Sequence, residues 1–130
     1  MKEIFDFLNK CGTYYLATVE DGKPRVRPFG TIDIYNGKLT IQTGMVKNVA
    51  KQMLKNPNIE ICACNKDKWI RIEAVVEVDE SEEATDHILE RYPYLRNMYR
   101  PGDGNTCVFV LKSGVATINS FGTEPKVIKF

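Results

Sequence analysis

The sequence predicts a mainly β fold: an antiparallel barrel of six or seven short strands, with two or three helices packed on its outside. Three observations support this prediction. Asp-Gly at 21–22 and Asn-Gly at 36–37 are strong hairpin signals between β-forming segments. Apolar and polar residues alternate strictly over residues 69–78, as in a strand with one buried face. Two short segments instead carry apolar residues at helical spacing. The 130 residues suffice for a single domain, residues 1–130.

The first third of the chain is predicted to be a helix followed by hairpins. Residues 2–10 form an amphipathic helix that ends at Gly12. Strands follow at residues 13–19, about 25–35 and 39–43, and the second is bent at Pro28 or Gly30. Because residues 20–23 and 36–37 form tight turns, these strands are expected to be antiparallel neighbours.

A second helix is predicted after residue 43, because the apolar period changes there from two to about 3.6 residues. The helix ends before Pro57, since the residue preceding a proline disfavours helical geometry. Its apolar face is expected to hold Val46, Val49, Ala50, Met53 and Leu54, and its polar face Lys47, Asn48, Lys51, Gln52 and Lys55.

The second half of the chain is predicted to be strand-rich, with one further helix. Strands are expected at 59–64 and 69–78, and a helix capped by Asp79 runs to about Arg91. Residues 93–105 are rich in turn formers. Two more strands, 106–111 and 115–119, are separated by residues 112–114, and residues 126–130 form a last strand.

Composition excludes several function classes. A single histidine, His87, cannot build a multi-histidine metal site, and no C-x-x-C spacing is present. The net charge of +1 argues against a nucleic-acid partner. No apolar run reaches the length of a membrane span, so no membrane partner and a reduced cytoplasmic location are expected. Cys62 and Cys64 are expected to be buried as small apolar residues, with a redox pair as the alternative.

Two cationic segments are candidates for an anion site. Arg25 and Arg27 are two residues apart, so both project from one face of a strand and can form forked hydrogen bonds to a phosphate. Lys47 lies at the start of the second helix, where a cation is unfavourable unless an anion is bound beside it. Gln42 and Thr43 lie between these segments. Each feature alone also fits ordinary solvated side chains.

The order of these motifs resembles the pyridoxamine 5′-phosphate oxidase-like family of FMN-binding split β-barrels. An aromatic strand with Ala17-Thr18-Val19 precedes Asp-Gly-x-Pro-x-x-Arg-Pro at 21–28. A strand ending at Thr43, then Lys47, a helix closing in Asn-Pro-x-Ile at 56–59, and Trp-Ile-Arg-Ile-Glu-Ala at 69–74 follow. The resemblance covers most of residues 1–80.

The resemblance implies FMN bound in clefts between the two subunits of a homodimer. Arg27, with Arg25 beside it, would meet the phosphate, and the backbone of Pro28, Phe29 and Gly30 would meet the flavin ring. Gln42 and Thr43 would line the ribityl region. Lys47 and Asn48 would bind the phosphate at the helix start, and Lys51 is the alternative cation. The partner subunit would cover the ring through Trp69 and the segment around Ser120.

The implied function is a flavin-dependent oxidoreductase or reductase acting on a small molecule, with NAD(P)H as a candidate electron donor. The alternative is a non-catalytic module that binds, stores or senses a flavin or another phosphorylated ligand. The C-terminal tail, residues 122–126, lacks the arginine and histidine substrate motif of the vitamin oxidases themselves. Oxidation of pyridoxamine phosphate is therefore not expected.

Overall fold

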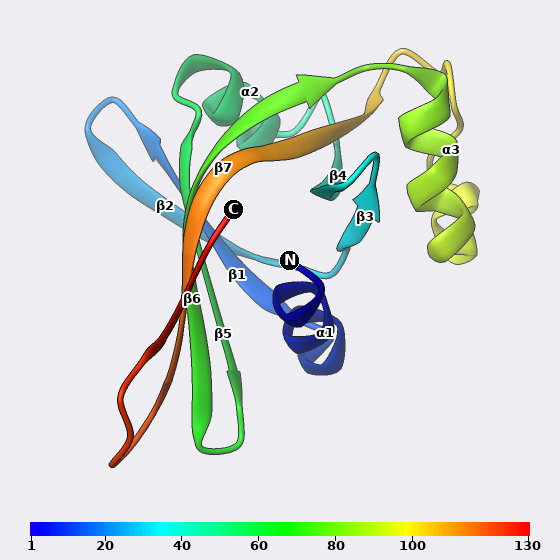
Figure 1. The fold of residues 1–130 in the computed structure, drawn as a ribbon. Helices are drawn as coiled ribbons and strands as arrows, with labels where there is room; N and C mark the ends of the chain where they lie inside the picture. Colours follow the sequence, from blue (N-terminus) through cyan, green and yellow to red (C-terminus); the bar gives the residue numbers. More distant parts are fainter.

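A computed structural model describes all residues, 1–130, and shows one antiparallel sheet with helices at its margins (Figure 1). The sheet has eight strands in the order β2-β1-β5-β6-β7-β4-β3, with β8 paired to β7. Because β2 and β3 end the order without pairing, the sheet curls but does not close, which agrees with the predicted split barrel. No helix is both long and apolar enough to cross a membrane.

The elements largely follow the predicted order, and the strands number eight instead of six or seven. The helices are α1 (Lys2–Cys11), α2 (Asn48–Lys55), α3 (Glu82–Arg91) and a short 3-10 helix η1 (Pro93–Asn97). The strands are β1 (Tyr14–Glu20), β2 (Lys23–Phe29), β3 (Asp33–Tyr35), β4 (Lys38–Gly44), β5 (Asn58–Asn65), β6 (Lys68–Asp79), β7 (Thr106–Ser120) and β8 (Lys126–Lys129).

The core lies inside the curl of the sheet and is closed by α1 and α2. Alternate residues of β6 are buried, as the strict alternation predicted. Helix α1 contributes Ile4 and Leu8, and α2 contributes Val49, Ala50 and Met53 to the same cluster. The helices therefore fix their position against the sheet by burying one apolar stripe each.

Strand β7 is one long strand, where two strands separated by residues 112–114 were predicted. Val75 pairs with Ser113 and Val76 with Leu111, so Lys112 is the extra residue of a β-bulge. Figure 1 shows β6 and β7 curving together from α3 to the opposite end of the molecule. The turn-forming residues therefore bend the strand without ending it.

Two other boundaries differ from the prediction. The expected strand at 25–35 is two strands, β2 and β3, which lie at opposite edges of the sheet. Residues 30–32 carry the chain from one edge to the other. The cap of α3 is Ser81, whose hydroxyl accepts from the Ala84 N–H, while Asp79 accepts from the Ser81 N–H. Both residues thus order this turn.

The faces of α2 and β5 also differ from the prediction in detail. Gln52 is buried, although it was assigned to the polar face of its helix, and Val46 and Leu54 are exposed. Cys62 and Cys64 are exposed, because the odd-numbered residues of β5 are the ones that enter the core.

Candidate functional site

The start of α2 offers free backbone donors without a protein partner. Lys47 is the N-cap residue, its side chain does not cap the helix, and the first turn contains no acidic residue. The leading N–H groups of a helix lack intrahelical acceptors and carry partial positive charge. The start of α2 therefore offers the kind of donors that an anion could accept from, as predicted for an anion site.

Arg27 is held beside this helix start by a polar network. Its guanidinium donates to the Leu16 carbonyl at 3.2 Å, to Thr18 Oγ1 at 2.8 Å and to Gln52 Oε1 at 2.6 Å. Gln52 also accepts from the Thr18 hydroxyl. The network joins β1, β2 and α2, so the position of Arg27 relative to the helix is fixed by folding.

The electrostatics of this cluster combine burial with one opposing charge. Burial lowers the pKa of Arg27, and the nearby Glu20 carboxylate offsets part of this effect. Glu20 accepts from Arg25 Nε at 3.3 Å and from Gln52 Nε2 at 3.3 Å. Arg25 is therefore partly neutralised, while Lys47 makes no ion pair with any residue of the chain.

These residues line an open cavity of about 480 Å³ between β2 and α2. Its charged side chains are three cations, Arg25, Arg27 and Lys47, and one anion, Glu20. Asn48 and Gln52 add neutral polar groups. The donor set is suited to a phosphate, which accepts several charge-assisted hydrogen bonds at once.

A second, smaller cavity of about 200 Å³ adjoins the first, and Lys47 lines both. One wall is the β2 exit, from Pro28 to Thr31, together with Gln42 and Thr43 of β4. The opposite wall comes from the η1 region and consists of Tyr94, Leu95, Met98 and Tyr99. The predicted residues Pro28, Phe29, Gly30, Gln42 and Thr43 therefore come together. They face a wall from a segment that was predicted only to be rich in turn formers.

The wall formed by residues 28–32 is fixed by side-chain hydrogen bonds from distant segments. Tyr14 donates its hydroxyl to the Thr31 carbonyl at 2.6 Å. The Tyr92 hydroxyl accepts from the Ile32 N–H and donates to the Ile32 carbonyl, each at 3.0 Å. The Thr31 hydroxyl accepts from the Gln42 N–H at 3.0 Å. These hydrogen bonds thereby hold the crossover, residues 30–32, which makes no ladder pairs.

The turn between β4 and α2 is held in a similar way. The Met45 N–H donates to the Asn105 carbonyl at 2.7 Å, and the Val46 N–H donates to Asn105 Oδ1 at 3.1 Å. A Cβ on Gly44 would approach Asn105 to 3.0 Å, so glycine allows the close contact. Asn105 is the last residue of the turn-rich segment 93–105.

Three predicted site residues lie away from this pair of cavities. Lys51 is exposed on α2 and lines neither of them. Trp69 packs against Phe121 with ring centroids 5.2 Å apart and ring planes tilted by 55°, and Ser120 pairs with Lys68 near the far end of the β6–β7 ladder. Trp69 lines a different cavity on that part of the sheet. Within one chain, Trp69 and Ser120 therefore line neither of the two cavities that Lys47 joins.

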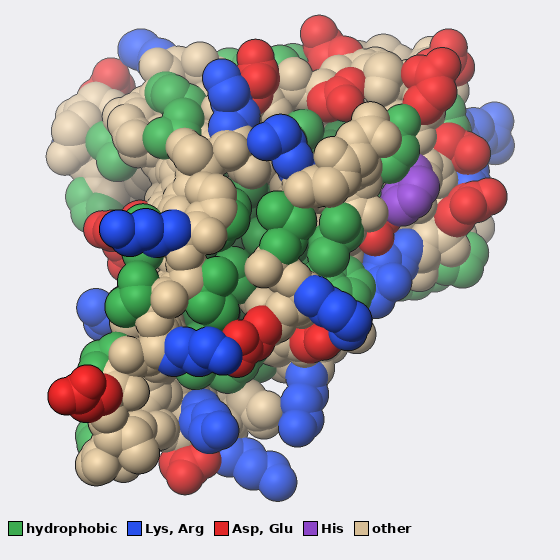
Figure 2. Space-filling model, in the orientation of Figure 1, with side chains coloured by type: hydrophobic (Ala, Val, Ile, Leu, Met, Phe, Trp, Pro, Cys, Tyr) green, Lys and Arg blue, Asp and Glu red, His purple; other side chains and the backbone are tan.

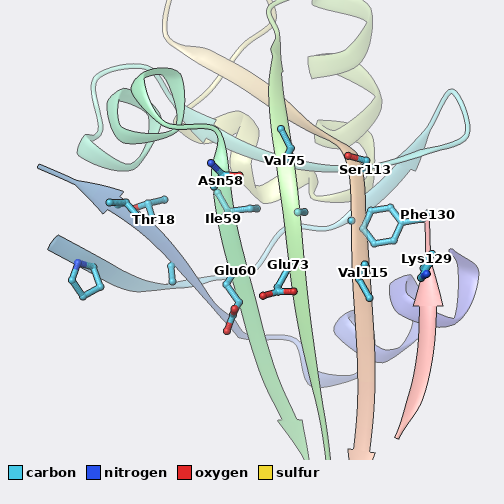
Figure 3. A pocket seen from close by; sticks show the side chains of 15 residues that line it. Thr18, Asn58, Ile59, Glu60, Glu73, Val75, Ser113, Val115, Lys129 and Phe130 are labelled. Carbon is cyan, nitrogen blue, oxygen red and sulfur yellow. The ribbon is translucent and has the colours of Figure 1, made fainter. Parts of the chain in front are cut away.

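The largest hollow, about 860 Å³, lies across β1, β5, β6 and β7 and is also bounded by β8 (Figure 3). Thr18, Val75, Val115 and Phe130 are among the residues that line it, and none of the predicted site residues does. Glu60 and Glu73 face each other directly across β5 and β6 in this region. Figure 2 shows further acidic side chains gathered at the end of the molecule that carries α3.

Comparisons with known proteins identify the family. Residues 1–119 match the sequence profile described as pyridoxamine 5′-phosphate oxidase. The chain belongs to this family of pyridoxamine 5′-phosphate oxidase-like proteins. The resemblance inferred from the motifs is thus confirmed, and proteins of this family commonly bind a flavin. No curated protein matches the chain.

Solved structures agree with this assignment. A NimC/NimA family protein from Clostridium acetobutylicum has 42% identity and a TM-score of 0.96, over 100% of this chain and 92% of that one. General Stress Protein 26 from Bacillus anthracis has 17% identity and a TM-score of 0.77, over 99% and 98%. An F420 reductase has 18% identity and a TM-score of 0.60, over 82% and 89%. The last two show a shared fold.

Proposed function

We propose that this protein binds FMN, with the phosphate in the cationic cavity and the flavin ring along the adjoining wall. The observation that carries the proposal is the position of Lys47, which lines both cavities and makes no ion pair within the chain. A ligand with one anionic group and one apolar group, joined by a short linker, suits two adjoining cavities of this kind.

The residues present fit FMN in their chemistry. Arg27, Lys47 and the N–H groups that open α2 supply the charge and the donors that a phosphate requires. Gln42 and Thr43 supply polar groups for the ribityl chain, and residues 28–30 supply backbone for the ring. Lys51 is the weaker of the two lysine candidates, since it lines neither cavity.

The proposed activity is a flavin-dependent oxidoreductase reaction on a small molecule, with NAD(P)H as the candidate donor. A bound flavin would supply hydride-transfer chemistry, which protein side chains do not offer. The role of the chain is to hold the phosphate at Arg27 and Lys47 and to orient the ring against residues 28–30. The wall containing Tyr94 and Met98 would limit access of water and select the shape of the substrate.

We further propose a homodimer, in which the partner covers the ring with Trp69 and Ser120. Opposed like charges such as Glu60 and Glu73 destabilise a sheet, and neither forms an ion pair within the chain. Arg71 lines the same cavity as both of them. Such a surface suits a second copy related by a two-fold axis, in which Arg71 meets the carboxylates. Light scattering of the wild type and of Arg71→Glu measures the oligomeric state. A monomeric wild type would contradict the proposed homodimer.

The cofactor is tested by titrating the ligand-free protein with FMN and with riboflavin, which lacks the phosphate. Two charged phosphate contacts make FMN bind roughly 100-fold or more tightly than riboflavin. Equal affinities would place the phosphate outside the cationic cavity, and binding of neither would overturn the proposal.

A cytoplasmic location is proposed together with FMN binding and is tested by cell fractionation.

Turnover separates the enzyme from a storage or sensing module. Steady-state oxidation of NADH or NADPH by the FMN-loaded protein, with a small acceptor present, supports the oxidoreductase. Tight FMN binding without turnover across donors and acceptors supports the non-catalytic alternative, which uses the same anchors.

A further inference from the structure

Three cysteines lie near one corner of the molecule, where α1 ends beside the far end of β5. Cys11 is the last residue of α1, and Cys62 and Cys64 lie on β5 with exposed side chains. The fourth, Cys107, is buried and donates to the Thr43 carbonyl. None of the three corner thiols lines the cavities assigned to FMN.

The contact that joins this corner is between Cys11 and Cys64. Cys11 Sγ donates to the Cys64 carbonyl oxygen at 3.6 Å, across 53 residues of sequence. A carbonyl oxygen lies about 2.4 Å from its own Cα, so the Cys11 sulfur is within roughly 6 Å of the Cys64 Cα. In a disulfide this separation is about 4 Å, so both side chains must turn toward each other and the Cys64 thiol must release its hydrogen bond to the Lys66 carbonyl.

The surroundings of the two thiols differ. Burial raises the pKa of Cys11, the charge of Cys64 raises it further, and Lys10 lowers it. Cys64, by contrast, is exposed to solvent and to small oxidants, and its thiol donates to the Lys66 carbonyl at 3.5 Å.

The alternative pair, Cys62 with Cys64, is disfavoured by strand geometry. Both residues lie within the continuous strand β5, two positions apart. Side chains at this spacing are parallel and separated by about 6.5 Å along an extended strand. A disulfide requires Cβ atoms about 3.8 Å apart, so this bond would distort the ladder that β5 forms with β6.

We propose that Cys11 and Cys64 are an oxidative modification site that forms a disulfide when the protein meets hydrogen peroxide. The Cys64 thiolate attacks a peroxide oxygen, the O–O bond breaks, and Cys64 becomes a sulfenic acid with release of water. Cys11 then attacks the Cys64 sulfur, the S–S bond forms and a second water leaves. Two thiols are oxidised and one peroxide is reduced to two waters. The product ties α1 covalently to β5.

The test uses the full-length reduced protein, exposed to graded hydrogen peroxide, then denatured and alkylated. Oxidised wild type loses two of its four alkylatable thiols, and the peptides carrying Cys11 and Cys64 migrate together until reductant is added. Because Cys62 and Cys64 fall in one tryptic peptide, variants assign the partner.

Cys64→Ser abolishes the cross-link, and Cys62→Ser, the matched control two residues away on the same strand, retains it. The thermal midpoint of oxidised wild type rises by roughly several degrees over the reduced form, since the bond closes a long loop, and Cys64→Ser shows no such rise. A cross-link that persists in Cys64→Ser, is lost in Cys62→Ser, or joins two chains on a non-reducing gel would overturn the assignment. So would full alkylation of peroxide-treated wild type.

Discussion

Replacing Lys47 with alanine separates ligand binding from folding more cleanly than any other change at the proposed site. The Lys47 side chain is exposed and makes no hydrogen bond or ion pair within the chain. Its removal should change the free energy of unfolding by less than about 0.5 kcal/mol. The loss of one charged contact to phosphate costs about 1.5–3 kcal/mol, so FMN affinity should fall roughly 10- to 100-fold.

The assay is quenching of flavin fluorescence, with urea unfolding measured on the same preparations. Lys51→Ala is the matched control, because Lys51 is an exposed lysine one turn further along α2 that lines neither cavity. It should leave FMN affinity within about twofold of wild type, and the difference between the variants should shrink as added salt screens exposed charges.

Two results would refute this reasoning. If Lys47→Ala binds FMN as tightly as wild type, the phosphate does not lie at the start of α2. If Lys51→Ala instead carries the loss, the phosphate lies one turn along the helix, and the two cavities do not form a continuous site.

Three further changes test how the fold supports the site. Tyr92→Phe leaves the Ile32 N–H and carbonyl without their partner, so urea unfolding should show a loss of about 2 kcal/mol. Gly114→Ala places a Cβ 2.5 Å from the Glu73 carbonyl oxygen, and a loss of about 1–3 kcal/mol is expected in the same measurement. Burial raises the pKa of Cys107 from 9.0 to about 12, so the folded state keeps a proton that the unfolded chain releases. The free energy of unfolding therefore falls as pH rises across this range, and Cys107→Ala should show a shallower fall in alkaline urea titrations. An unchanged stability in the first two variants, or an unchanged pH slope in the third, contradicts the corresponding packing argument.

The sequence was most informative where one physical requirement dominates a segment. Strand β6 was predicted because one of its faces is buried along nearly its whole length. Strand β7 was divided wrongly because Gly114 was interpreted as a turn residue. In the structure, the absence of a side chain at Gly114 leaves room for the Glu73 carbonyl and the Phe130 ring. These contacts come from segments distant in sequence, so the residues around Gly114 do not reveal them.

The proposed site shows the same division between local and long-range information. Arg27 and Lys47 could be placed together because each follows from a local pattern on adjacent elements. The burial of Gln52 could not be predicted in this way, since a polar residue on a helix is expected to face solvent unless its hydrogen-bond partner is known. That partner is Arg27, which approaches from β2, 25 residues away in sequence. Asn105 and the η1 wall come from still more distant segments.

The two cations of the proposed site have different roles because the protein constrains them differently. Of the five N–H donors of a guanidinium, Arg27 commits three to the protein, which leaves two for a ligand. Its conformational entropy is lost during folding, so binding does not incur that cost again. Lys47 keeps its freedom and can follow a phosphate whose position is set by the ring. A fixed arginine beside a mobile lysine therefore lets the rigid wall at residues 28–32 determine how a flavin is oriented, with the phosphate supplying affinity.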